Sequence, residues 1–188
     1  MFERVGQSIA AAALVTVIGA VVARSGELET ARAALQDRLY PIAQAHAQKA
    51  LRESGGNRVP ALLVLLEAQS EQGLFGEVLQ TLDANEAVIR GASAPEAFVY
   101  WRAQALLKSG RAADAVRLTD SLSLAGSAYA DALRRMRARA KQASGDPEGA
   151  MLLFAEVDRT STNDVTRAAN ALEWAMALEE AGRLEAAL

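Results

Sequence analysis

A short pattern recurs four times along this chain at nearly constant spacing: a glycine followed five positions later by a small or apolar residue. The copies are Gly73 to Val78, Gly110 to Ala115, Gly145 to Ala150 and Gly182 to Ala187, and their glycines lie 37, 35 and 37 residues apart. Helix-forming sequence lies on both sides of each glycine. A period in the thirties of this kind predicts helical hairpins that bury their apolar faces by stacking on one another. Such an array is typical of a scaffold rather than a catalyst.

The composition predicts an all-α fold. Ala, Leu, Arg, Glu and Gln are abundant and aromatic residues make up only 5% of the chain, which favours helix because these side chains lose little freedom in it. With 188 residues and 51% apolar content, the chain can bury a substantial core. The net charge of -3 argues against nucleic acid as the main partner, and the absence of cysteine excludes disulfides, thiolate metal sites and a cysteine nucleophile.

Residues 1–23 form an apolar leader. Arg4 precedes an apolar run from Ile9 to Ala23, whose 15 residues are short for a membrane-spanning helix of about 20 residues but suit a secretory signal peptide cleaved after Ala23. Counting from Val5 lengthens the run to 19 residues, so an uncleaved N-terminal membrane anchor is the alternative. Both interpretations predict a bacterial-type exported protein, either periplasmic or anchored in the inner membrane and facing the periplasm, in preference to a cytoplasmic one.

A third interpretation places the leader inside the fold. The stretch from Gly26 to Ala31 also fits the recurring pattern, which would make the apolar run the first helix of a hairpin. The run is apolar on all faces, however, whereas an outer helix of a helical array should carry a polar stripe. This favours the leader.

Residues 24–56 predict an irregular N-terminal helical hairpin or cap. Helical spacing extends from Glu27 to Arg52, but Pro41 interrupts it. The segment is therefore either kinked at Pro41 or split into two helices, with Pro41 in the first turn of the second. From residue 57 to 188 the pattern is regular, and the expected hairpins span 59–92, 95–127, 128–162 and 165–188, the last of them incomplete.

The small residues of these hairpins carry a resemblance to a known family. Seven positions before three of the glycines stand Ala103, Ala138 and Ala175. Five positions after the same glycines stand Ala115, Ala150 and Ala187. An aromatic residue, Phe154, follows four positions after Ala150. The stretch from about Val59 to Leu188 thus resembles the tetratricopeptide repeat (TPR) family, although Leu66, Val78 and Thr119 depart from its pattern. The resemblance implies an α-solenoid of antiparallel helix pairs, coiled as a right-handed superhelix with a concave groove that binds a peptide or protein.

The first helices of successive hairpins would line that groove. The expected groove residues lie on two helical stripes: Tyr100, Gln104 and Lys108, and Arg135, Arg139 and Gln142. A pair of guanidinium groups beside Lys108 could hold a carboxylate through bidentate hydrogen bonds. The Lys/Asn pattern by which some TPR proteins clamp a C-terminal carboxylate is not reproduced. The alternative is a solvated face, because four arginines lie almost around one helix: Arg134, Arg135, Arg137 and Arg139.

We expect the remaining candidate residues to lie in helix packing or on the solvated surface. Successive helical side chains diverge by about 100°, so we expect Trp101 in hairpin packing and Tyr100 in the groove. His46 has neither a second histidine nor a cysteine with which to complete a metal site. The sequence contains no phosphate-binding loop, nucleophile elbow or dinucleotide fingerprint. We therefore expect no cofactor, no metal and no catalysis.

Three functions agree with these patterns. The first is a non-enzymatic protein-protein interaction scaffold, an exported TPR-type module that binds a peptide or protein partner in its groove. The second is the N-terminal regulatory part of a larger protein, with a catalytic or secretion domain beyond Leu188. The third is a self-assembling structural protein.

Overall fold

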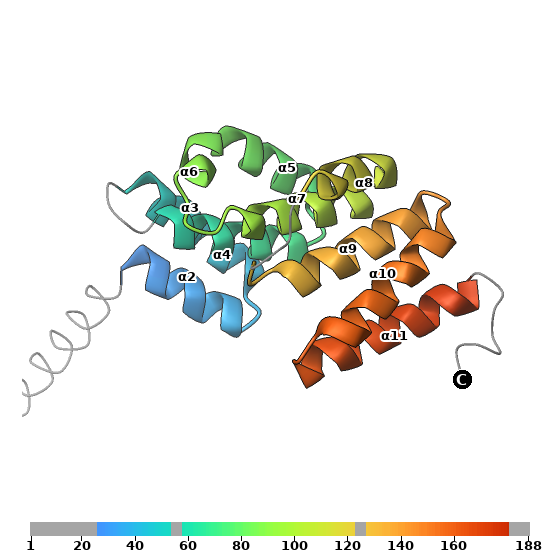
Figure 1. Ribbon diagram of the computed structural model, residues 1–188. Coiled ribbons are helices and arrows are strands. Elements are labelled where there is room, and N and C mark those ends of the chain that lie inside the picture. The colour runs from blue at the N-terminus through green and yellow to red at the C-terminus, as the bar shows by residue number, and fades with distance from the viewer. Residues whose placement is uncertain (1–25, 54–57, 123–126, 181–188) are drawn as a thin grey trace, which may run out of the picture. The chain divides into compact units, whose positions relative to one another are not determined.

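The computed structural model describes residues 26–53, 58–122 and 127–180. Within these ranges the chain forms ten helices and no strand (Figure 1), so the prediction of an all-α fold is confirmed. The apolar leader at 1–23 and the fourth glycine, Gly182, lie outside the described residues. Among the helices that are described, none is both long and apolar enough to cross a membrane.

The chain divides into two units between Gln72 and Gly73. In the first unit α3 packs against both of its neighbours, and α2 also contacts α4. Pro41 lies in the first turn of α3, so the chain is split there rather than kinked. The core clusters described in this unit consist mainly of alanine, whose small side chain lets the three helices approach closely. The helices are α2 (Glu27–Gln36), α3 (Tyr40–Arg52) and α4 (Arg58–Glu71).

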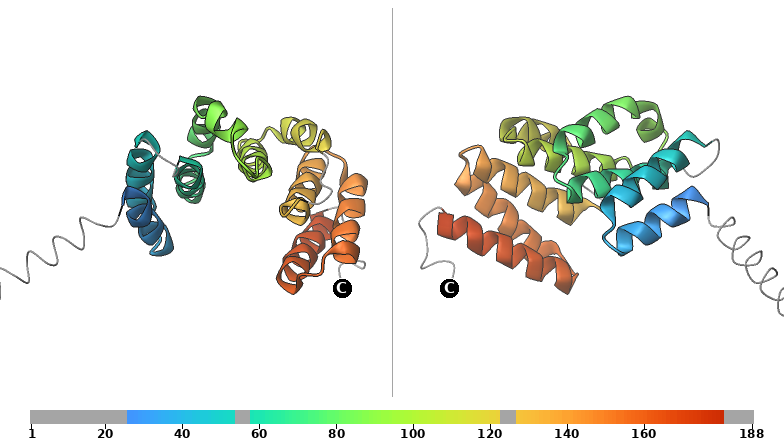
Figure 2. Two further views of the ribbon diagram at one scale, coloured as in Figure 1. Left: turned by 60° about the vertical axis from the view of Figure 1, so that its left-hand side comes forward. Right: turned by 180° about the vertical axis from the view of Figure 1, so that it is seen from behind.

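In the second unit each helix from α7 to α10 packs against the helix that follows it in the chain. Helices α7 and α11 also contact α9. Figure 2 shows α9 and α10 side by side. Small residues mediate these contacts, as in the cluster of Leu106, Ala115 and Ala140 from three successive helices. The helices are α5 (Phe75–Ala84), α6 (Glu86–Arg90), α7 (Glu96–Lys108), α8 (Ala112–Asp120), α9 (Ala130–Ala143), α10 (Pro147–Thr160) and α11 (Asp164–Glu180).

The recurring glycines lie in turns with left-handed backbone. Gly73, Gly110 and Gly145 have φ angles of 73°, 74° and 91°, a conformation that glycine adopts without the steric cost of a Cβ atom. Asp146 caps the helix that follows Gly145, because its side chain accepts a hydrogen bond from the backbone N–H of Gly149 at 2.8 Å. The turns predicted from the glycine pattern are thus present at all three described positions.

Arg38 adds a fourth left-handed turn residue that the glycine pattern did not reveal. It lies between α2 and α3 with φ 58°, 35 positions before Gly73. Burial follows one register around all four turns: the residues seven positions before, five after and nine after the turn residue are 0% exposed. They are Ala31, Leu66, Ala103 and Ala138; Ala43, Val78, Ala115 and Ala150; and Ala47, Leu82, Thr119 and Phe154.

This register has a consequence for residues 26–53. The sequence assigned 24–56 to an irregular hairpin or cap, yet the described part of that segment has the same buried positions as the later turns. The burial register, unlike the glycine, is therefore also present around the turn between α2 and α3. The individual repeat boundaries from 59 to 188 stay predictions.

Candidate functional site

A hollow of about 440 Å³ lies among α7, α9 and α11 of the second unit. Its polar lining consists of Lys108, Arg139, Gln142 and Glu173. The apolar lining consists of Leu107, Ala143, Met176 and Ala177. Hollows of this size commonly hold small ligands, and this one lies among three helices that alternate in chain order.

Three of the six predicted groove residues line this hollow. Lys108 comes from the last turn of α7, and Arg139 and Gln142 come from α9. These residues were predictable from the sequence because helical spacing places them on the expected stripes. The structure therefore brings together residues from two helices that the sequence placed on a common surface.

The two aromatic neighbours on α7 contact each other. Tyr100 and Trp101 are both half-buried, and their rings meet edge to face with centroids 5.5 Å apart and an interplanar angle of 77°. Such edge contacts are favourable because the positive ring edge of one aromatic meets the negative face of the other. Neither residue is among those lining the hollow.

Arg135 is engaged inside the protein. Its Nη1 lies 3.5 Å from Oε1 of Glu173 on α11, and both side chains are largely enclosed, with 21% and 27% exposed. Since this guanidinium already faces a carboxylate, it does not form a free pair with Arg139, as the carboxylate-binding hypothesis assumed. Glu173 was not predicted, because it lies 38 positions from Arg135 in sequence and no local pattern connects the two.

The charge of the hollow is positive. Within the described residues neither Lys108 nor Arg139 has a carboxylate within ion-pair distance, while the lining carboxylate of Glu173 already faces Arg135. Two cations without a counterion at one site create a local field that attracts anionic groups, even though the whole chain carries a net charge of -3. The site can therefore hold a carboxylate or another anion.

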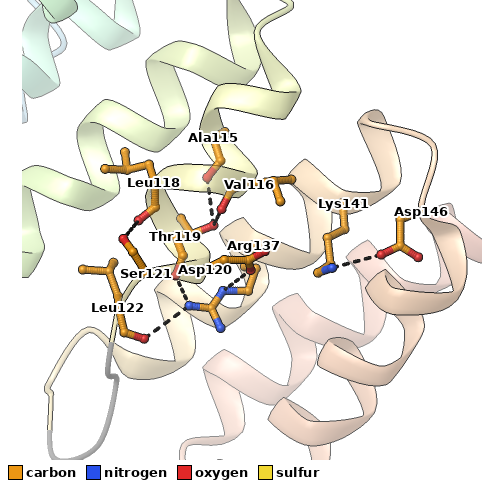
Figure 3. A network of polar contacts seen from close by, with 10 residues as sticks. All are labelled: Ala115, Val116, Leu118, Thr119, Asp120, Ser121, Leu122, Arg137, Lys141 and Asp146. Carbon is orange, nitrogen blue, oxygen red and sulfur yellow. Dashed lines mark hydrogen bonds and ion pairs between the residues drawn. The ribbon is translucent and has the colours of Figure 1, made fainter.

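The other arginines of α9 hold neighbouring helices together rather than forming a wholly solvated face. Arg134 lies 3.1 Å from Glu156 of α10. Arg137, with 16% of its side chain exposed, pairs with Asp120 at 3.3 Å. It also donates hydrogen bonds to the carbonyl oxygens of Thr119 and Leu122 at the end of α8 (Figure 3). Of the four arginines, only Arg139 reaches the hollow.

Two other polar clusters lie in the first unit. His46 Nδ1 lies 2.5 Å from Oε2 of Glu27 across α2 and α3, and this hydrogen bond lowers the pKa of the Glu27 carboxyl. Burial, followed by the charge of Glu71, raises the pKa of Glu67 on α4. Neither cluster has the composition of a metal site, and no group of His, Cys, Asp and Glu among the described residues could hold a metal ion.

Comparison with known proteins identifies no relative. No protein-family model matches the chain, and no match was found among curated proteins or solved structures. The strongest functional feature is the positively charged hollow among α7, α9 and α11.

Proposed function

We propose that this chain is a non-enzymatic interaction module that binds a segment of a protein partner in the hollow among α7, α9 and α11. The observation that carries the proposal is that three alternate helices contribute side chains to one hollow whose two cations, Lys108 and Arg139, have no counterion within the described residues. Alternate helices line the concave surface of helical-hairpin arrays, which is the surface that these proteins use for binding.

The repeated packing supports the solenoid part of this proposal. Fully buried residues recur in the same register around the turns at Arg38, Gly73, Gly110 and Gly145. A short helical hairpin cannot bury its apolar face alone, so repetition of one register is what stacking of similar hairpins requires. We assign the chain to the TPR-type α-solenoids on this ground and on the small residues of the sequence pattern.

Export is a separate part of the proposal and depends on the leader alone. The apolar run at Ile9–Ala23 behind Arg4 supports a signal peptide or an inner-membrane anchor. The test is to fuse a reporter enzyme that is active only outside the cytoplasm to Leu188. Activity that disappears when residues 1–23 are deleted is the expected result, and activity without the leader contradicts export by this segment.

Site-specific photo-crosslinking in the cells that make the protein tests the binding proposal. Ala143 lines the hollow and is exposed, so a photoreactive phenylalanine analogue there should capture a partner polypeptide. Ala113, which is exposed on α8, is the matched control. We expect a discrete adduct from position 143 that is absent from position 113 and is lost in the Lys108→Glu/Arg139→Glu variant. Equal adducts from both positions, or an adduct unaffected by the charge reversal, contradict the assignment of the hollow.

A further inference from the structure

The geometry points to a ligand of defined chemistry: a peptide segment in which a carboxylate lies beside a large apolar side chain. This inference rests on the proposed function and states which segments the hollow selects. We call Lys108 and Arg139, from α7 and α9, the cationic side of the hollow, and Met176 and Ala177, from α11, its apolar side. Glu173 also comes from α11, and Leu107 and Ala143 add apolar lining from α7 and α9. The two sides require two different groups on the ligand.

The cationic side consists of Lys108 and Arg139. Arg139 is half-buried and presents a planar set of donors, which suits bidentate binding of a carboxylate. Lys108 is exposed and adds a second positive charge on the same hollow. Since neither cation has a carboxylate partner within the described residues, an incoming carboxylate displaces no intramolecular ion pair of these two groups. This end of the hollow is therefore complementary to one acidic group.

The apolar side consists of Met176 and Ala177. Met176 lines the hollow, and 55% of it is exposed, while Leu172, four positions earlier and hence on the same helix face, is 65% exposed. Large apolar side chains exposed next to one another are typical of binding surfaces. A flexible methionine also adapts its shape to the apolar group that covers it. This end of the hollow is therefore complementary to an apolar side chain.

Glu173 sets the order of the two groups. It lines the hollow from α11, where its carboxylate faces the guanidinium of Arg135 at 3.5 Å, so α11 contributes no cation to the described lining. A ligand carboxylate beside α11 would lie next to a carboxylate that is already paired, whereas α7 and α9 supply the cations Lys108 and Arg139. The ligand carboxylate is consequently directed toward α7 and α9, with the apolar side chain toward α11.

Selection from a random peptide display library, with the full chain as bait, tests the inference. We expect enriched sequences to contain Asp or Glu at a constant spacing from Leu, Met or Phe. In fluorescence anisotropy with synthetic copies of these peptides, the Lys108→Gln/Arg139→Gln variant should bind roughly tenfold more weakly or worse, since a charged hydrogen-bonded contact is lost. Replacing the peptide's acid by its amide should weaken binding to the wild type but have little further effect on this variant.

Substitutions at matched positions separate the two sides of the hollow. Met176→Gln should weaken the binding of peptides that have the apolar side chain. It should not change the binding of peptide variants in which alanine replaces that side chain. Leu152→Gln on α10, at a residue 74% exposed, and Arg117→Gln on α8, whose side chain is 74% exposed, are the controls and should leave binding unchanged. Circular dichroism of each variant verifies that the helices are retained.

The outcomes distinguish this inference from the function on which it rests. Peptides that depend on the hollow but lack either the acid or the apolar side chain overturn the inference and leave the binding function standing. A selection without any peptide that depends on the hollow overturns both. Amidating the C-terminus of each peptide distinguishes an acidic side chain from a terminal carboxylate, and either source supports the carboxylate site.

Discussion

The carboxylate of Asp146 fills the space that a Cβ atom on Gly149 would occupy. Asp146 accepts the backbone N–H of Gly149 at 2.8 Å and an ammonium hydrogen of Lys141 at 2.9 Å. Gly149→Ala must therefore displace the residue that caps α10. We expect this substitution to lower the free energy of unfolding by about 1 kcal/mol, the usual cost of a lost N-cap, as measured by urea denaturation of the full chain.

Gly76→Ala is the matched control for that substitution. Gly76 also lies in the first turn of a helix, but an added Cβ would meet no atom within 4 Å. Alanine should stabilise the protein there by roughly 0.5 kcal/mol, because it loses less backbone entropy on folding than glycine. If the two substitutions changed stability in the same direction, the steric role assigned to Asp146 would be wrong.

Substitutions at Arg38 and Gly110, which both have left-handed backbone, should change stability in opposite directions. Gly110 has φ 74° and open space around the Cβ position, so Gly110→Ala should destabilise by about 1 kcal/mol through backbone strain alone. Arg38, at φ 58°, already bears that strain, and Arg38→Gly should be neutral or stabilise by up to about 1 kcal/mol. Thermal unfolding of both variants checks the pair. A clear loss of stability in Arg38→Gly would contradict the equivalence of the two turns.

Arg137 stabilises the end of α8. Its guanidinium donates to two backbone carbonyls and pairs with Asp120 (Figure 3), and Arg137→Ala should lower the free energy of unfolding by about 2 kcal/mol, because hydrogen bonds from charged groups are removed. Arg117→Ala, at an ion pair on α8 whose arginine is 74% exposed, should change stability by less than about 0.5 kcal/mol. If Arg137→Ala and Arg117→Ala lowered the free energy of unfolding equally in urea denaturation, the partly buried contacts of Arg137 would stabilise the protein no more than an exposed ion pair does.

The Glu27 carboxyl makes the stability depend on pH. The hydrogen bond with His46, and to a smaller extent the charge of Lys49, lowers its pKa in the folded protein below the ordinary value of 4.5. A lowered carboxyl pKa contributes stability above pH 4.5 that is lost as the pH falls through the folded-state pKa. Glu27→Gln should therefore be less stable than the wild type at neutral pH, with the difference disappearing in acid.

Urea denaturation of wild type and Glu27→Gln at a series of pH values measures that difference. Glu29→Gln serves as the control, because Glu29 lies on the same helix, is exposed and has no ion pair within the described residues. A stability difference for Glu27→Gln that stayed constant from neutral pH into acid would contradict the linkage.

Most of the helices and turns could be predicted because their signals are local. Gly110 and Gly145 mark turns through their tolerance of positive φ, and Asp146 with Pro147 marks a helix start through capping. The site was predictable only in part. Lys108, Arg139 and Gln142 lie on helical stripes that spacing reveals, whereas Met176 belongs to a helix whose sequence pattern predicted no groove residue.

The sequence by itself determined the helical class and the turns at the recurring glycines, since backbone preference and apolar spacing act within a few residues. Only the tertiary structure decided that Arg38 lies in an equivalent turn without glycine, and that Glu173 pairs with Arg135 and so leaves Arg139 and Lys108 as the cations of the hollow. The reason is physical: an ion pair between residues 38 positions apart depends on which helices pack together, and no local stretch of sequence determines that packing.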